Sequence, residues 1–187
     1  MYRGLLVSLL LAGACARGEI TLPAQDAATL VSLDASTTWA YVELSSGTGV
    51  APANAAASTA WDIGFNGTSV LLNGGTSGPG GIVAYCVCQN ATASDQQLAS
   101  FTPDNQLASF QSVTVADVPP ATANWSAEVF ATSPWFRFNI GGDNRVHPTF
   151  SVYLIKRGSV VYKLQVTSYY GPAGEPRRIG IRYVRVT

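Results

Sequence analysis

The sequence has few charged residues, one histidine and one methionine, and each shortage excludes a class of site. Charged residues make up 12% of the 187-residue chain, which is about half the share of an average soluble protein. The formal net charge is zero, so the total charge gives no reason to expect a nucleic acid as partner. With His147 as the single histidine and Met1 as the single methionine, sites built from several histidines or from a methionine of the processed chain are excluded.

Basic residues are missing from the long central part of the chain. Between Gly18 and Pro134 there are nine acidic residues and no lysine or arginine. From Trp135 to Thr187 the balance reverses, with nine basic residues against Asp143 and Glu175. The zero total therefore hides an acidic first part and a basic last part.

Long apolar runs are also missing after residue 20, and the one apolar run lies at the N-terminus. Arg3 precedes the apolar stretch 5–11, and small residues follow at 12–14, which is typical of an export signal. The run is shorter than the roughly 20 residues that a membrane-spanning helix needs. Cys15 follows directly, in a position similar to that of the lipidated cysteine of bacterial lipoproteins. We expect a lipid anchor on Cys15, and an ordinary signal peptide that discards this cysteine stays open as the alternative.

The three cysteines leave one pair after Cys15. In an extended strand, Cys86 and Cys88 would point to the same face with Cα atoms about 6.6 Å apart, at the upper limit for a disulfide. Because an exported protein meets oxidising conditions, a Cys86–Cys88 disulfide is one hypothesis, and two small buried thiols are the other. A structural zinc site needs four ligands, and the sequence offers no second cluster.

Short extended segments with turn signals between them dominate the chain. A loop with five glycines is expected over 74–81, a helical turn over 94–100, and a tight hairpin at 157–159. Strands are expected over 39–44, 61–65, 69–73, 82–88, 111–116, 135–140, 150–156, 160–169 and 179–186. The sequence therefore predicts an export signal over 1–15, a tether over 16–30 and a single all-β, β-dominated domain over 31–187.

Two cations of the last strands alternate with apolar residues. Arg182 lies between Ile181 and Tyr183, and Lys163 lies between Tyr162 and Leu164. If the apolar neighbours face the core, both cations face outward. This predicts a cationic sheet face, which is either a solvated surface or a surface that meets an anion. The anion would be a carboxylate-bearing ligand or the acidic part of the same chain.

Catalytic motifs are not evident. The glycines of 74–81 precede a strand, whereas a phosphate-binding loop precedes a helix. The sequence contains no Gly-x-Ser-x-Gly nucleophile elbow for which His147 would be the catalytic base. We interpret His147 as a structural histidine at the start of a strand, because the following Pro148 favours extended backbone at position 147. Asp62 is interpreted as a buried carboxylate bound to backbone. We therefore expect no enzymatic activity.

Several sequence strings resemble the HmuY family of bacterial haem-binding lipoproteins. They are WAYVEL at 39–44, WDIGF at 61–65, LNGGTSGPGG at 72–81, HPTFSVYLI at 147–155, VYKLQV at 161–166 and SYY at 168–170. The resemblance covers about residues 30–187. It implies a β-rich, antiparallel domain with a ligand cleft, exported to the outer membrane or cell surface on a lipid anchor. A periplasmic or secreted location is the alternative. Haem would be the cargo, and an outer-membrane receptor the partner.

The iron ligands of the best-known family members do not carry over to this chain. Those proteins hold iron between two histidines or two methionines, whereas this chain has one histidine, which matches the His-Pro-Thr-Phe string rather than a ligand position. If haem binds, the resemblance leaves His147 with water or Tyr153 as iron ligand, and Arg145 near a propionate. The alternative is a family member without haem binding that acts as a structural or protein-interaction module at the cell surface.

Overall fold

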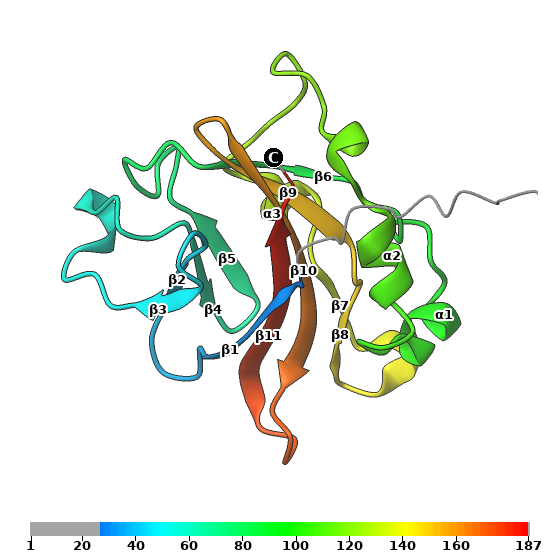
Figure 1. The fold of residues 1–187 in the computed structure, drawn as a ribbon. Helices are drawn as coiled ribbons and strands as arrows, with labels where there is room; N and C mark the ends of the chain where they lie inside the picture. The colour runs from blue at the N-terminus through cyan, green and yellow to red at the C-terminus, as the bar shows by residue number, and fades with distance from the viewer. Residues whose placement is uncertain (1–26, 187) are drawn as a thin grey trace, which may run out of the picture.

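The structure is a computed structural model, which describes residues 27–186. The expected export signal, the expected lipidation site Cys15 and most of the expected tether lie outside these residues. Within them, eleven strands form three antiparallel sheets, with a few short helices (Figure 1). The all-β prediction is therefore confirmed.

Five strands make the central sheet, in the order β1-β11-β10-β9-β6. Their bounds are β1 (Thr29–Asp34), β6 (Val83–Cys86), β9 (Val152–Arg157), β10 (Val160–Tyr170) and β11 (Pro176–Arg185). The expected strands 150–156, 160–169 and 179–186 are thus confirmed. Sequence reasoning missed β1, which begins two residues inside the expected tether and pairs with β11 along its whole length.

A smaller sheet has the order β3-β2-β4-β5, and β7 pairs with β8 in a hairpin. The strands are β2 (Ala40–Glu43), β3 (Thr48–Val50), β4 (Ile63–Asn66), β5 (Ser69–Leu72), β7 (Phe136–Phe138) and β8 (Val146–Pro148). The helices are α1 (Asp95–Ser100), α2 (Leu107–Ser112) and α3 (Val129–Thr132), with 3-10 turns η1 (Ala55–Ala57), η2 (Val115–Asp117) and η3 (Ile140–Gly142). A capping box between Ser94 and Gln97 fixes the start of α1.

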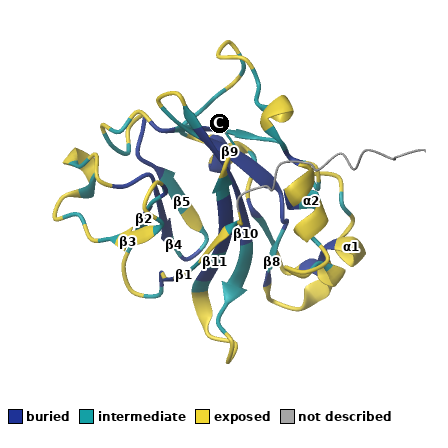
Figure 2. Ribbon diagram, viewed as in Figure 1, coloured by how far each residue is buried: buried dark blue, intermediate teal, exposed yellow. Residues whose placement is uncertain are grey.

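The main core lies between the two larger sheets. Alternate residues of β10, namely Tyr162, Leu164 and Val166, pack in one cluster with Val42 and Phe65 of the smaller sheet. Because side chains alternate across a strand, one face of the central sheet supplies this cluster. Figure 2 shows that the middle of the central sheet is buried whereas the loops around it are exposed.

The other face of the central sheet is covered as well. Phe110 and Val113 pack on Val152, Leu154 and Val161 in a second cluster. A sheet covered on both faces shows nearly continuous burial along its central strands, and β10 is buried without a break from Val161 to Val166.

This cover overturns two predictions. Lys163 and Arg182 do lie on the face opposite to the main core, but they are 1% and 5% exposed, so the expected solvated cationic face is wrong. The strand expected over 111–116 is also wrong, because the chain forms α2 and η2 there. Phe110 of α2 and Val113, directly after this helix, both pack on the sheet, and their segment buries the two cations.

The glycine-rich loop 74–81 is confirmed, and it is tightly held around Asn73. The Asn73 side chain is fully buried and donates through Nδ2 to the carbonyls of Ser58 and Trp61, both at 2.8 Å. Its Oδ1 accepts the Gly80 N–H at 3.0 Å. A Cβ at Gly78 would lie 2.1 Å from Asn73 Oδ1, so glycine is required where the loop passes this amide.

Carboxylates of the acidic first part pair with arginines of the basic last part. Arg157, at the end of β9, contacts Glu43 Oε1 at 2.5 Å and Asp62 Oδ2 at 3.3 Å, and so joins the two larger sheets. Further pairs of this kind are Arg178–Asp34 and Arg137–Asp95. Asp62 also accepts the Leu44 N–H at 2.8 Å, as the interpretation of a buried carboxylate bound to backbone requires.

Candidate functional site

A cleft of about 540 Å³ opens on the second face of the central sheet. Strands β1, β10 and β11 form its floor, and the segment that joins α1 to α2 overhangs it. The lining residues are Ala28, Leu30, Val31, Ser32, Pro103, Asp104, Leu107, Thr167, Gly180, Ile181 and Arg182. Its volume and its mostly apolar lining are typical of a small-molecule site.

Small residues on the floor make this cleft hollow. In the register of β1 and β11, Ser32 lies opposite Gly180, and Leu30 lies opposite Arg182. Gly180 has no side chain, and a Cβ there would come within 2.9 Å of Thr167 Oγ1. The floor is therefore open at Gly180 and Ser32, next to the long side chain of Arg182.

Arg182 is the buried charge of the cleft. It donates to the Pro103 carbonyl, and its guanidinium lies 5.8 Å from the ring centre of Phe110. Burial lowers the pKa of Arg182, and the nearby Asp104 carboxylate opposes this effect. Sequence reasoning placed this residue on the correct face and expected a ligand cleft, but it did not assign Arg182 to the cleft, because the overhanging segment comes from a distant part of the chain.

Lys163 is a second buried cation on the same face. Its Nζ donates to the Val113 carbonyl at 2.7 Å and lies 4.7 Å from the ring centre of Phe110. Burial lowers its pKa, opposed by the carboxylate of Asp117. Lys163 also lines a neighbouring cavity of about 130 Å³ that shares Ala28 and Leu107 with the cleft.

His147 and Arg145 lie together on the β7–β8 hairpin, outside the lining of the cleft. The Nε2 atom of His147 lies 2.5 Å from Asp143 Oδ2. The Arg145 guanidinium stacks 4.5 Å from the ring centre of Tyr170. Desolvation acts to raise the pKa of Asp143, but the hydrogen bonds from the Arg145 N–H and His147 together outweigh it, so this pKa is lowered.

Tyr153 is separated from the other two sequence-predicted residues. Its side chain is fully buried in the main core, and its hydroxyl donates to the Ser133 carbonyl at 2.8 Å. Burial raises the pKa of this phenol. The structure therefore gives Tyr153 a place in the core and does not present it to a ligand.

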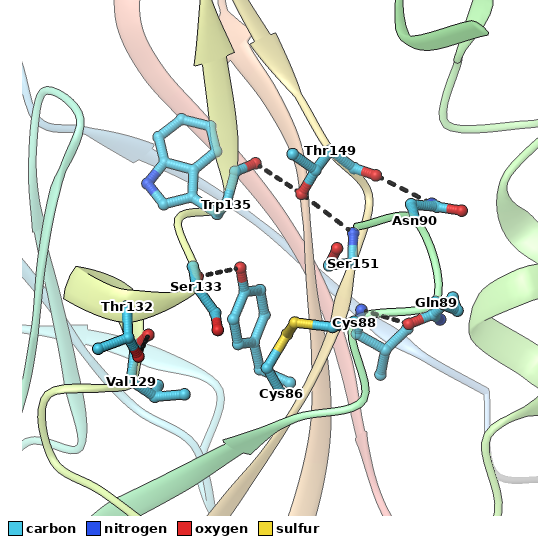
Figure 3. Close-up of a disulfide and its surroundings, with 12 residues drawn as sticks. Cys86, Cys88, Gln89, Asn90, Val129, Thr132, Ser133, Trp135, Thr149 and Ser151 are labelled. Atoms are coloured by element: carbon cyan, nitrogen blue, oxygen red, sulfur yellow. Dashed lines mark hydrogen bonds between the residues drawn. A yellow bond between two sulfur atoms is a disulfide. The ribbon is translucent and has the colours of Figure 1, made fainter. Parts of the chain in front are cut away.

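Cys86 and Cys88 form a disulfide at the end of β6 (Figure 3), with Cα atoms 5.0 Å apart. This distance is shorter than in an extended strand, and the chain leaves the disulfide through Cys88 with a left-handed backbone, at φ of 55°. The next two side chains then continue the contacts of the sheet edge. Gln89 accepts the Val152 N–H at 3.1 Å, and Asn90 donates to the Thr149 carbonyl at 2.9 Å.

Among residues 27–186, no group of three or more His, Cys, Asp or Glu side chains is arranged to hold a metal ion. None of the helices in the same range has the length and apolar character needed to cross a membrane. Two separate candidate places remain, the cleft with Arg182 and the hairpin with His147 and Arg145.

Comparison with protein families gives a match over most of the chain. The family model described as HmuY protein matches residues 35–183. Among curated proteins, none matches the chain.

Solved structures share the fold at low sequence identity. A protein of Bacteroides vulgatus, described as HmuY-like and haem-binding, is 12% identical with a TM-score of 0.52, and the match covers 86% of this chain and 92% of that one. An apo HmuY analogue of Tannerella forsythia is 15% identical with a TM-score of 0.51, covering 86% and 96%. A Bacteroides fragilis protein described as a lipoprotein is 16% identical with a TM-score of 0.50, covering 90% and 96%.

Proposed function

Because the chain belongs to the HmuY family, we propose that it is a non-enzymatic haem-binding protein, held at the cell surface by a lipid on Cys15. The family match over residues 35–183 carries this proposal. The cleft on the central sheet supports small-molecule binding by this fold, since its volume and mostly apolar lining are typical of such sites, and His147 lies outside it. In this function the protein captures haem or a similar tetrapyrrole and passes it to a receptor in the outer membrane.

His147 is the residue proposed to ligate the iron, with Arg145 near a propionate. His147 is half-buried at the base of the β7–β8 hairpin, and its side chain is 18% exposed. Ligation through Nε2 would require Asp143 to release this nitrogen, whereas ligation through the other ring nitrogen would keep Asp143 as an orienting partner. Tyr153 is left out of the proposed ligand set because its hydroxyl is buried and bound to Ser133.

A specific observation favours the second candidate, a family member that acts as a protein-interaction module without haem. The lining of the cleft contains none of the side chains that usually ligate haem iron, which are His, Met, Cys and Tyr. A non-haem member would keep the fold and the cell-surface location while its cleft served another ligand or none.

Titration with haemin separates the two candidates. We expect the full chain to give a saturable shift of the Soret band at micromolar haemin. Since even an outer partner of a metal ligand contributes about 10–100-fold to affinity, His147→Ala should weaken binding by at least about tenfold. Asp143→Asn keeps the imidazole and removes the charge of its outer partner, so this variant should lose less affinity than His147→Ala. Absence of a saturable shift in the unmodified protein would overturn haem binding in favour of the second candidate.

The lipid anchor is tested by Cys15→Ser. We expect the unmodified chain to fractionate with membranes when expressed in a bacterial host, and the variant to appear in the soluble exported fraction. Two or more acyl chains are needed for stable anchoring, so loss of the acceptor thiol should release most of the protein. Unchanged membrane partition of the variant would refute anchoring through Cys15.

A further inference from the structure

Arg182 has more hydrogen-bond donors than the protein satisfies. A guanidinium carries five N–H donors, and the bond to the Pro103 carbonyl is the one that Arg182 makes within residues 27–186. Its Nε is buried without an acceptor. Gln165 lies opposite Arg182 in β10, and its Oε1 also lacks a partner. If Gln165 accepted the Nε–H, the donors on Nη1 would still have no acceptor from residues 27–186, and they are open to whatever occupies the cleft.

The charge of Arg182 is not neutralised by a contact either. Across the described part of the chain, no carboxylate lies within 4.0 Å of Arg182 or Lys163. Asp104 and Asp117 act on the two cations only at longer range. Burying two cations without ionic partners costs free energy, and an anion bound in the cleft would offset part of this cost.

We propose that the cleft binds an apolar ligand bearing a carboxylate, and that Arg182 holds the carboxylate. Planar carboxylates match the N–H fork of arginine and accept two parallel hydrogen bonds from it. The apolar walls suit the remainder of the ligand and are formed by Ala28, Leu30, Val31, Leu107 and Ile181. This site does not depend on iron or on His147, which is not part of the lining, so it is tested separately from haem binding.

The first test compares ligands of one shape and different charge on the unmodified full chain. Dodecanoate should bind saturably, and dodecan-1-ol and dodecyltrimethylammonium should bind at least about tenfold more weakly, because hydrogen bonds to a charged group are among the stronger ones. Isothermal titration calorimetry measures all three, below the critical micelle concentrations of the two ionic ligands and below the solubility limit of dodecan-1-ol. No saturable binding of dodecanoate, or equal binding of dodecanoate and dodecan-1-ol, would overturn the proposal.

The second test uses Leu30, which lies directly opposite Arg182 and is 75% exposed. Leu30→Glu should place a carboxylate of the protein beside Arg182 and so weaken dodecanoate binding by about tenfold or more. Leu30→Gln has the same shape without the charge and should retain the preference for dodecanoate over dodecan-1-ol. Equal affinities of these two variants for dodecanoate would contradict the role of Arg182.

Removal of the arginine itself completes the test. Arg182→Gln should lose the preference for the carboxylate, whereas Arg178→Gln should keep it, because Arg178 lies on the same strand outside the cleft. If Arg182→Gln does not fold, the comparison of Leu30→Glu with Leu30→Gln still tests the role of Arg182.

Metal-free protoporphyrin IX identifies the source of the carboxylate. Displacement of dodecanoate by this porphyrin assigns the site to a tetrapyrrole propionate, and failure to displace it assigns the site to a fatty-acid-like chain.

Discussion

Replacing Arg157 with methionine is expected to destabilise the protein by about 3 kcal/mol at pH 7. The substitution leaves the carboxylates of Glu43 and Asp62 without their shared cation, and the Asp62 side chain is 1% exposed. Removing one partner of a buried ion pair costs about 3–5 kcal/mol. The lower end applies because the Arg157 side chain is 39% exposed and partly screened by solvent. Urea unfolding followed by tryptophan fluorescence measures the loss.

The pH dependence of this loss identifies the buried carboxylate. Burial raises the pKa of Asp62 above its ordinary value, although the Leu44 N–H and Arg157 act to lower it. Protonation of Asp62 therefore favours the folded state. This stabilising contribution is lost as pH rises through the folded-state pKa. Without Arg157 this pKa rises further, and the destabilisation should be smaller at pH 5 than at pH 7. The double variant Arg157→Met/Asp62→Asn should be more stable at pH 7 than Arg157→Met alone.

A matched control is Arg178→Met, which breaks the exposed pair with Asp34. Exposed pairs contribute about 0–1 kcal/mol, so this variant should unfold near the urea midpoint of the unmodified protein.

Glu43 adds a second dependence of stability on pH, in the acid range. Partial burial acts to raise its pKa, but hydrogen bonds from Ser45, Ser46 and Arg157 lower it to about 2. The stability that Glu43 contributes is present above its unfolded-state pKa and should be lost as pH falls toward 2. A pH-independent loss in Arg157→Met would contradict this account.

Gly74→Ala is expected to cost about 3 kcal/mol, the upper end for overpacking a closed site. A Cβ at position 74 would lie 2.1 Å from the carbonyl oxygen of Ile82 and 3.0 Å from its backbone N and C atoms. Because Ile82 N–H donates to the Asn73 carbonyl at 2.9 Å, this backbone cannot retreat without breaking the loop. Chemical denaturation measures the change in unfolding free energy.

Gly81→Ala is the matched control in the same loop. A Cβ there meets nothing within 4 Å, but the residue has φ of +66°, so the expected cost is the left-handed backbone alone, about 1 kcal/mol. A loop that is loosely held would tolerate both substitutions equally. Equal losses in Gly74→Ala and Gly81→Ala would therefore refute the tight packing around Asn73.

The sequence predicted most strands of the central sheet, because alternation of apolar and polar residues depends only on neighbouring positions in the chain. The alternation around Tyr162 and Tyr183 placed their strands correctly, and the glycines after Asn73 correctly predicted a loop. The strand expected over 111–116 failed because its β-branched residues lie in a segment whose conformation is set by packing on a distant sheet. Intrinsic strand preference is weaker than such tertiary contacts.

The sequence alone determined the β-dominated class, the alternation of the last strands, the family resemblance and the division into an acidic and a basic part. The tertiary structure alone decided what the basic residues meet. Arg157 joins two carboxylates of the other sheet, and Arg182 and Lys163 are buried beneath α2 and the segments beside it, one of them in a cleft. The physical reason is that alternation fixes the face on which a side chain lies, whereas the partner on that face comes from contacts between segments far apart in the chain.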